Sequence, residues 1–426
     1  MSGVGVDRAS AVMFLETGDP GHNTSTPGDN SGWQYSGNFS TFLGVPIAPH
    51  FFITAKHFGG TVGNTFTWHG DDYVTIAVHT SPTTDLAIWE VNHAKPFPTY
   101  APLSTGVADL GTNAMVFGRG TQRGVPVVVS SENKGWRWGP GDDVKRWGRN
   151  VVSIFVDGGS SFGELLQCDF NNPGLDSECH VSVGDSGGGL FVLENGLWRL
   201  AGVHLSVDGP FRTDSMDSTG FNAALFDAGG MEYKQQESPP IWTAIPEDDD
   251  DVASSFYSSR ISASMTWITS TASGAGTIPN ENFAAWQKLY FTPTQIADPL
   301  VSGPLADFDR DGISNVVEFA LHLDPIFNEQ VTMEAGTGIR GLPLVRQEDV
   351  LGNDRLTIEF VRRSAANGSG LTYVPEFSDD LVTWEPAGTE SASAINPRWE
   401  RVKCTDSQTI QDSNRRFARL RVMLAD

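Results

Sequence analysis

The sequence has few cysteines, few basic residues and no long apolar run. Its 426 residues include only three cysteines, which excludes a scaffold held together by several disulfides. Cys168 and Cys179 are close enough in the chain for one loop bridge, and the sequence leaves the bridged and the free forms open. No apolar stretch is long enough to span a membrane, so we expect no membrane span.

Basic residues are outnumbered by acidic ones, 28 against 52, which gives a formal net charge of −24. Such a surface repels the phosphates of nucleic acids and the anionic headgroups of membranes, so we expect neither as a partner. Acidic side chains are instead suited to hold cations such as calcium.

The first residues also lack a recognisable export signal. The segment "MSGVGVDRASAVMFLETG" has neither the basic start nor the long apolar core of a signal peptide. Either a signal was removed before this numbering begins or the protein is intracellular. We expect the former, and hence a secreted or cell-surface protein, because of a calcium-binding motif described below.

What the sequence has in plenty is short β-like runs. Val, Thr, Phe and Trp gather in segments separated by Gly, Pro, Asn and Asp, for example at 51–55, 73–78, 86–91 and 125–130. Many short strands with closely spaced turn residues predict a β-barrel or a sandwich over residues 1–206.

The later part of the chain changes character. Helical spacing is present at 259–268, and a run of small residues at 269–280 predicts a linker. A short helix is predicted at 283–291. Strict alternation of apolar and polar residues at 355–360 and 418–424 then predicts strands of a second β region.

Three short segments carry the residues needed for nucleophilic catalysis. A serine hydroxyl attacks a carbonyl only when a base lies within hydrogen-bond reach and a carboxylate orients that base. "ITAKHF" ends an apolar strand on a histidine, "TDLAIWEV" places an aspartate before one, and "VGDSGGG" sets a serine among glycines; the three residues are His57, Asp85 and Ser186. The glycines let the amides of Gly184 and Ser186 point at one spot, as an oxyanion hole requires.

These segments resemble the motifs of trypsin-like serine proteases, usually written TAAH, DIAL and GDSGGP, and they occur in the same order. Segment 259–268 resembles the closing helix of that family. The resemblance implies a trypsin-like double β-barrel over residues 1–272 and a secreted serine endopeptidase acting on protein or peptide substrates. Within it, His57 is the general base, Asp85 orients His57, and Ser186 is the nucleophile.

Two other functions remain open at this stage. A catalytically silent chain of the same fold would act as a calcium-dependent binding or cell-surface adhesion module. An esterase would use the same three residues on a different substrate. The family pattern also departs at Phe58, where many members have a disulfide cysteine, and no activation sequence of the IVGG kind is present at the start of the chain.

The resemblance also implies which residues contact the substrate. His180 lies six residues before Ser186, at the family's pocket floor, and it is not the Asp of proteases that cleave after Lys or Arg. His204 falls where glutamyl endopeptidases place a histidine that binds an acidic side chain. The alternative is that His204 is a packed strand residue beside the apolar Leu205 and Val207.

A second motif lies outside the catalytic region. "DFDRDGISNVVE" at 307–318 fits the twelve-residue calcium loop pattern D-x-D-x-D-G-x5-E. Side-chain oxygens are expected from the aspartates, a carbonyl from the seventh position, a direct or water-mediated contact from the ninth, and two oxygens from the glutamate; the ligands are then Asp307, Asp309, Asp311, Ile313, Asn315 and Glu318. The alternative is an acidic turn that caps the helix after it.

The segment before this loop, 298–306, contains Pro and Gly and does not provide the entering helix of an EF-hand. The loop therefore resembles the single calcium loops of thrombospondin-type or dockerin-like repeats. We expect a structural Ca²⁺ and no cofactor for catalysis.

The overall prediction is a mainly β protein in three parts: a protease domain at 1–272, a linker with the calcium loop and a helix at 273–330, and a β-sandwich-like module at 331–426. Tyr373 and Trp384 in the last part are candidates for contact with a cell surface or a polysaccharide. Core packing is the alternative use of these aromatic residues.

Overall fold

The structure is a computed structural model that describes residues 12–27, 31–235, 241–248, 250–277, 281–328, 330–365, 368–386, 388–412 and 415–425. The chain divides into two compact units, one of residues 1–194 and 198–277 and the other of residues 195–197 and 278–426. Within the described residues, no helix combines the length and the apolar character needed to cross a membrane.

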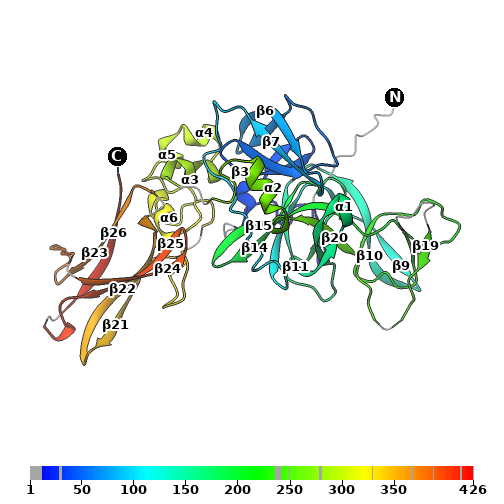
Figure 1. Ribbon diagram of the computed structural model, residues 1–426. Helices are drawn as coiled ribbons and strands as arrows, with labels where there is room; N and C mark the ends of the chain where they lie inside the picture. The colour runs from blue at the N-terminus through cyan, green and yellow to red at the C-terminus, as the bar shows by residue number, and fades with distance from the viewer. Residues whose placement is uncertain are drawn as a thin grey trace, which may run out of the picture. The chain divides into compact units, whose positions relative to one another are not determined.

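The first unit contains two closed β-barrels, drawn in blue and in cyan to green in Figure 1. The strand order of the first barrel is β2-β3-β4-β7-β6-β5, with β2 (Gly37–Phe39), β3 (Phe42–Ala48), β4 (Phe51–Ala55), β5 (Thr65–Trp68), β6 (Asp71–Thr80) and β7 (Leu86–Val91). The order of the second is β11-β12-β20-β15-β14-β8, with β8 (Asn113–Gly118), β11 (Arg146–Asp157), β12 (Glu164–Asp169), β14 (Gly189–Glu194), β15 (Leu197–Val207) and β20 (Ser255–Arg260). The predicted mainly β double-barrel architecture is confirmed.

One continuous core joins the two barrels. Val45, Ile53 and Ile88 of the first barrel and Phe117 and Phe191 of the second belong to the same cluster of buried apolar side chains. Each of these side chains is removed from water, and burial of a large apolar side chain contributes about 1.5–3 kcal/mol. The boundary between the barrels is therefore a packed layer, and loops at its edge are held in fixed positions.

Short sheets and helices complete the first unit. β1 (Met13–Phe14) pairs with β13 (Cys179–His180), a hairpin of β9 (Thr121–Val129) and β10 (Glu132–Gly141) pairs with β17 (Ala223–Leu225), and a third sheet holds β16 (Phe211–Arg212), β18 (Glu232–Lys234) and β19 (Trp242–Ala244). The helices are η1 (Trp33–Tyr35), α1 (Gly159–Phe162), η2 (Ser262–Ser264) and α2 (Met265–Thr271).

The closing helix begins later than its sequence pattern predicts. Ser259 and Arg260 belong to β20, because β20 pairs with both β12 and β15, and the helical region starts only after Ile261. Ile261 and Ile268 are buried in the core between the barrels, as their helical spacing predicts.

The cysteines of the first unit are not bridged. Cys168 on β12 and Cys179 on β13 are both free and fully buried, and Cys404 in the second unit is free as well. Burial raises the pKa of the Cys168 and Cys179 thiols well above its ordinary value, so both stay protonated and unreactive.

The second unit combines short helices with two β-sheets, shown in yellow-green to red in Figure 1. The helices are α3 (Phe283–Tyr290), α4 (Pro293–Ile296), α5 (Pro299–Ser302), α6 (Asn315–Leu321) and the 3-10 turn η4 (Ile410–Asp412). The sheets have the orders β21-β22-β25-β24 and β23-β26, from β21 (Leu344–Val350), β22 (Asn353–Arg363), β23 (Leu371–Ser378), β24 (Gly388–Asn396), β25 (Trp399–Asp406) and β26 (Phe417–Leu424).

Helix α6 lies at the centre of this unit. Phe319 packs against α3 through Phe283 and Trp286, whereas Ala320 and Leu321 pack against the sheet residues Val361 and Trp399. The segment before α6 provides a single helical turn, α5, which starts at a proline because the first helical position needs no amide hydrogen. It is too short to be the entering helix of an EF-hand.

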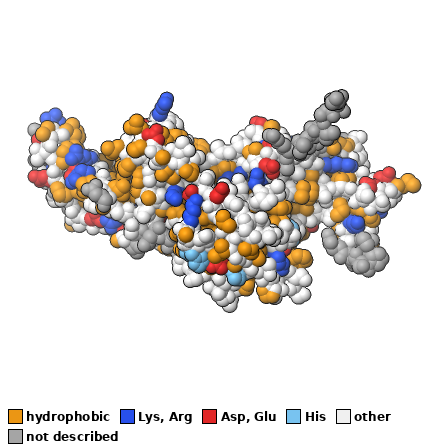
Figure 2. Space-filling model, turned by 90° about the horizontal axis from the view of Figure 1, so that it is seen from above, with side chains coloured by type: hydrophobic (Ala, Val, Ile, Leu, Met, Phe, Trp, Pro, Cys, Tyr) orange, Lys and Arg blue, Asp and Glu red, His pale blue; other side chains and the backbone are white. Residues whose placement is uncertain are grey.

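The two aromatic residues proposed for surface contact differ, because Tyr373 packs in the core of the unit and Trp384 is half-buried at its surface. The Tyr373 hydroxyl donates to the Ala320 carbonyl at 2.9 Å and its ring packs in the core. The Trp384 ring is covered by the Arg419 guanidinium, 4.1 Å from the ring centre. On the face shown in Figure 2, Lys and Arg side chains lie among acidic and uncharged ones and form no continuous basic area.

Candidate active site

The histidine and the aspartate come from neighbouring strands of the first barrel. β4 runs beside β7 with Ala55 opposite Leu86, so the residues that follow β4 and precede β7 lie side by side. His57 Nδ1 is 2.6 Å from Asp85 Oδ2. The Asp85 side chain is 3% exposed and the His57 side chain 39% exposed, so a shielded carboxylate orients a ring that solvent and substrate can reach.

The loop that carries Asp85 is tied to the strand that carries His57. The Lys56 amide donates to the Asp85 carbonyl at 2.8 Å, and Lys56 Nζ donates to the carbonyls of Ser81 and Thr84 at 3.0 and 2.6 Å. Lys56, the residue before His57, therefore fixes the position of the carboxylate relative to the imidazole.

Ser186 approaches from the second barrel, in the turn before β14. Its Oγ is 2.9 Å from His57 Nε2. Gly187 has a φ of 79°, and a side chain there would collide with Thr54 Oγ1 and the Leu43 carbonyl. The glycine is required because the turn presses against β3 and β4, and this close approach places the serine beside the histidine.

Asp185 holds this turn from inside. Its carboxylate is 0% exposed and accepts the amides of Gly120 and Ser182, both at 2.7 Å, and the amide of Val12 at 3.4 Å. Burial raises the pKa of Asp185 to about 6, although these hydrogen bonds favour the ionised form.

The amides of Gly184 and Ser186 are free to bind an oxyanion. Among the described residues, neither N–H has a hydrogen-bond acceptor, whereas the adjacent amides of Asp185, Gly187 and Gly188 each donate to a carbonyl. Gly184 has a φ of 95°, which residues other than glycine rarely adopt. The two amide donors that the motif predicts for the oxyanion, those of Gly184 and Ser186, are thus available in this turn.

A cavity of about 180 Å³ opens beside Ser186. Its wall is mostly apolar and consists of Trp138, Val181, Ser182, Val183, Ser186, His204, Leu205, Ser206 and Val207. No Asp, Glu, Lys or Arg lines it, so a charged group placed there would lose its hydration without gaining an ionic partner.

The two histidines expected in the substrate pocket differ in position. His204 lines the cavity but is 1% exposed, and its Nδ1 is 2.9 Å from Ser258 Oγ. Burial lowers the pKa of His204 to about 3, so the ring is neutral at physiological pH and does not present a positive charge to an acidic substrate. This favours the alternative of a packed strand residue.

His180 does not line the cavity. It is 0% exposed, it pairs with Met13 across β1 and β13, and its Nδ1 is 2.7 Å from the Val181 carbonyl. The resemblance in sequence implied a place at the pocket floor, from its spacing to Ser186, but pairing with β1 turns it into the core. Its assignment as a substrate contact is corrected accordingly.

Trp138 lines the cavity, but no motif in the sequence points to it. It comes from β10, in a hairpin between the two barrel strands β8 and β11. Phe58 also has a definite place: its ring stacks on Phe42 at 4.2 Å, next to His57, where many relatives of the resembled family have a disulfide.

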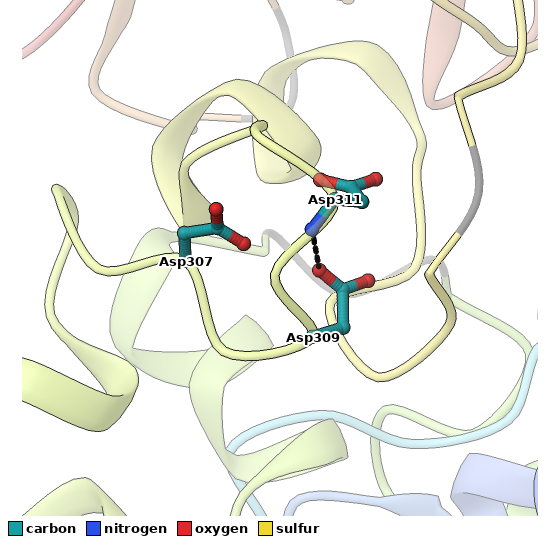
Figure 3. Close-up of side chains that lie close together, drawn as sticks. All are labelled: Asp307, Asp309 and Asp311. Carbon is teal, nitrogen blue, oxygen red and sulfur yellow. Dashed lines mark hydrogen bonds between the residues drawn. The ribbon is translucent and has the colours of Figure 1, made fainter.

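The predicted metal ligands lie in the second unit. Asp307, Asp309 and Asp311 are brought together so that one oxygen of each lies within 4.8 Å of the others, and Figure 3 shows the three carboxylates around a common space. Ile313 and Asn315 are buried at the start of α6, and Glu318 is buried within it.

No family model matches the sequence, and no curated protein sequence matches it. Among solved structures, the chain is similar to the Rv3671c protease in an inactive form, at 16% identity, over 54% of this chain and 82% of that one, with a TM-score of 0.29. It is also similar to Rv3671c from M. tuberculosis H37Rv in an inactive serine-to-alanine form, at 18% identity, over 49% of this chain and 87% of that one, with a TM-score of 0.29. A likeness of this degree carries no inference about what the chain does.

Proposed function

We propose that this chain is a serine endopeptidase that hydrolyses peptide bonds through an acyl-enzyme on Ser186. The observation that carries the proposal is the unbroken hydrogen-bonded series from Asp85 through His57 to Ser186, with distances of 2.6 and 2.9 Å. Each member is useless for this chemistry alone, and all three meet where two barrels join.

Acylation follows from this geometry. His57 Nε2 takes the proton from Ser186 Oγ as that oxygen attacks the carbonyl carbon of the substrate. The shielded Asp85 carboxylate stabilises the imidazolium and keeps the Nδ1 proton in place. The amides of Gly184 and Ser186 donate to the oxyanion, and His57 then passes its proton to the departing amine.

Deacylation uses the same groups in the same order. Water occupies the place of the departed amine, His57 Nε2 accepts its proton, and the resulting hydroxide attacks the ester carbonyl. The oxyanion returns to the two amides. Collapse of this intermediate releases the carboxylic acid and restores the proton to Ser186.

The cavity beside Ser186 sets the preferred substrate. Its walls of Val181, Val183, Leu205, Val207 and Trp138 favour a peptide with a large apolar side chain just before the cleaved bond. A neutral His204 gives an acidic side chain no counter-charge there. We therefore propose apolar rather than acidic selectivity.

Labelling with a fluorophosphonate probe tests the activated serine. Wild-type protein is expected to be labelled and Ser186→Ala is not, whereas Ser160→Ala, which removes an exposed serine of α1, is labelled like wild type. Folded wild type that resists the probe would contradict the proposal and favour the catalytically silent binding module.

Cleavage assays then separate a peptidase from an esterase. Peptide amides and the matching esters are compared on the same enzyme, and product formation is followed by mass spectrometry. Turnover of both, lost together in Ser186→Ala, is the expected result. Turnover of esters alone would replace the endopeptidase with an esterase.

A further inference from the structure

The loop before α6 is shaped by its own aspartates. Gly312 N donates to Asp307 Oδ2 at 3.0 Å, Asp311 N to Asp309 Oδ1 at 3.2 Å, and Ile313 N to Asp311 Oδ1 at 2.7 Å. Figure 3 shows the second of these bonds and the three carboxylates lying near one another. These contacts bend the chain around a shared space, but they leave three like charges beside one another.

A fourth carboxylate closes the same region and has nothing to bind. Glu318 is 1% exposed, and neither of its oxygens has a hydrogen-bond partner. In the part of the chain that the structure describes, no Lys, Arg or His forms an ion pair with Glu318 or with Asp307, Asp309 or Asp311. A buried carboxylate without donor or cation is strongly unfavourable.

The charges around Glu318 are all negative. Burial and, after it, the charges of Asp309, Asp311, Asp324 and Asp307 together raise the pKa of Glu318 to about 9. Such a group of acids is stable only with a cation at its centre, because the cation satisfies the oxygens and cancels the repulsion together.

The segment after α6 folds back onto the same loop. Asn328 Nδ2 donates to the Asp309 carbonyl at 3.0 Å, and Gln330 Nε2 donates to the Asp311 carbonyl. Asp324, which begins this segment, is 2% exposed, and its Oδ1 accepts the Ile326 amide at 3.0 Å. Because this segment is bonded to the loop at two positions, it brings the buried Asp324 carboxylate, which lies beyond the twelve-residue pattern, close to the three aspartates.

We propose that this cluster binds one Ca²⁺ and that Asp324 is a ligand in addition to those of the loop pattern. The ligands are Asp307, Asp309, Asp311, the Ile313 carbonyl, Glu318 and Asp324, with Asn315 acting directly or through water. Only oxygen is offered, which suits calcium rather than a transition metal. Ca²⁺ takes about six to eight oxygens, a number that this set supplies without the entering helix of an EF-hand.

Asn315 holds the start of α6 against the segment that precedes the loop. Its Nδ2 donates to the carbonyls of Val301 and Gly303 at 3.1 and 2.9 Å, so the amide ties α5 to the start of α6. Its Oδ1 has no hydrogen-bond partner and is free for the ion or for a water on it.

The ion thereby joins the segments before and after α6. Because Phe319, Ala320 and Leu321 pack in the core of the second unit, an ion that fixes both ends of α6 stabilises that whole unit. Single loops of this kind suit millimolar calcium, which is the concentration outside cells, and we place the protein there or at the cell surface.

Calorimetric titration tests the site on the full chain. Ser186→Ala is used as the background so that self-cleavage does not interfere, and the protein is first stripped with a chelator. CaCl₂ is expected to bind in a saturable manner with one ion per chain and to raise the unfolding temperature. Absence of both effects would overturn the proposal.

Variants locate the ion. Glu318→Gln is expected to weaken binding by about 100-fold or more and Asp324→Asn by about tenfold, since even indirect partners of metal sites cost about 10–100-fold. Glu385→Gln removes an exposed acid of the same unit and is expected to bind like the background protein. Undiminished binding by Glu318→Gln would overturn the site, and undiminished binding by Asp324→Asn alone would overturn the added ligand.

Thermal unfolding of the same variants excludes misfolding as the cause. In the chelated state, Glu318→Gln is expected to be at least as stable as the background protein, because a neutral amide of the same shape removes the cost of keeping an unpartnered carboxyl group among four acidic side chains. A variant that is unfolded even without calcium would instead assign Glu318 a structural role, contrary to the proposal.

Discussion

Asp185 in the first unit and Glu318 in the second are buried to the same degree, 0% and 1% exposed, yet their surroundings differ completely. Asp185 accepts three backbone amides, and burial raises its pKa only to about 6. Glu318 has no donor and four acidic neighbours, and its pKa is raised to about 9. The polypeptide itself completes the turn around Ser186, whereas the loop at 307–318, called the carboxylate loop below, would be completed by the proposed calcium ion.

This difference has a consequence for how each region responds to change. In the turn that carries Ser186, backbone amides of the protein itself satisfy the buried Asp185 carboxylate, so the proposed function depends there on geometry alone. In the carboxylate loop, the described residues supply carboxylates but no counter-charge, so the proposed calcium site would make stability depend on the calcium concentration. Substitutions in the candidate active site are therefore expected to leave calcium binding by the second unit unchanged.

The largest effect is expected when the catalytic series is broken. Ser186→Ala and His57→Ala are each expected to lower kcat by about 10⁶-fold, and the double variant by no more, because the two residues act as one unit. Steady-state kinetics on an apolar peptide substrate measures this. Calcium binding is expected to be unchanged in both variants, and strictly additive losses would contradict a shared role.

The turn before β14 gives the next largest effect. Gly187→Ala would push a methyl group into Thr54 and the Leu43 carbonyl, and the resulting displacement of Ser186 is expected to lower kcat by about 10²-fold. Gly111→Ala is the matched control, since Gly111 also has a positive φ, 68°, but has no atom within 4 Å of the added carbon. It is expected to cost about 1–2 kcal/mol of stability and no activity.

Equal activity losses in the two glycine variants would mean that backbone strain, and not the collision, disturbs the turn. Thermal unfolding of both variants accompanies the kinetics, so that a loss of folded protein is not counted as a loss of turnover.

Short sequence patterns located the candidate catalytic residues and the aspartates of the loop, but they did not identify the residues that surround them. The strands before His57 and after Asp85 are continuous apolar runs, and Ser186 sits among glycines, so each group could be placed on its element from a few neighbouring residues. The aspartates of the loop follow a fixed spacing for the same reason. These features depend on short segments, and short segments are what a sequence pattern records.

The features that the sequence did not reveal all depend on distant contacts. Pairing with Met13 turns His180 into the core, and the strand partners of β20 draw in Ser259 and Arg260. Trp138 reaches the cavity from a hairpin. Asp324, the added ligand that we propose, lies in a segment that is bonded back to the loop after α6. Each position is set by an element far away in the sequence or outside the motif.

The apolar cavity predicts a selectivity that also separates the two regions. A peptide with Phe before the cleaved bond is expected to have a kcat/KM about 10²-fold above that of the same peptide with Glu, because the carboxylate would be buried without a partner. Competition between the two peptides, read by mass spectrometry, measures the ratio. Preference for Glu would mean that the cavity, like the carboxylate loop, takes its counter-charge from elsewhere.

The smallest expected effect is a pH dependence of stability that comes from the buried, neutral ring of His204. Burial lowers the pKa of His204 from an ordinary 6.5 to about 3. Below about pH 6.5 the unfolded chain takes up a proton at this ring and the folded chain does not, so the stability that the neutral ring contributes is present above that pH and is lost as the pH falls toward about 3. Between about pH 7.5 and about pH 5.5 the loss from one such group is about 1.4 kcal/mol.

Urea unfolding of the first unit at these two pH values measures that loss in the Ser186→Ala background. His204→Gln keeps a polar side chain beside Ser258 but cannot titrate, so its stability is expected to fall by about 1.4 kcal/mol less than that of the background protein. If the two proteins lose the same unfolding free energy between the two pH values, His204 is protonated in the folded state as well. The cavity would then carry a positive charge at acidic pH, and selectivity for acidic substrates would have to be reconsidered, because an imidazolium facing the cavity is the partner that a glutamate side chain needs.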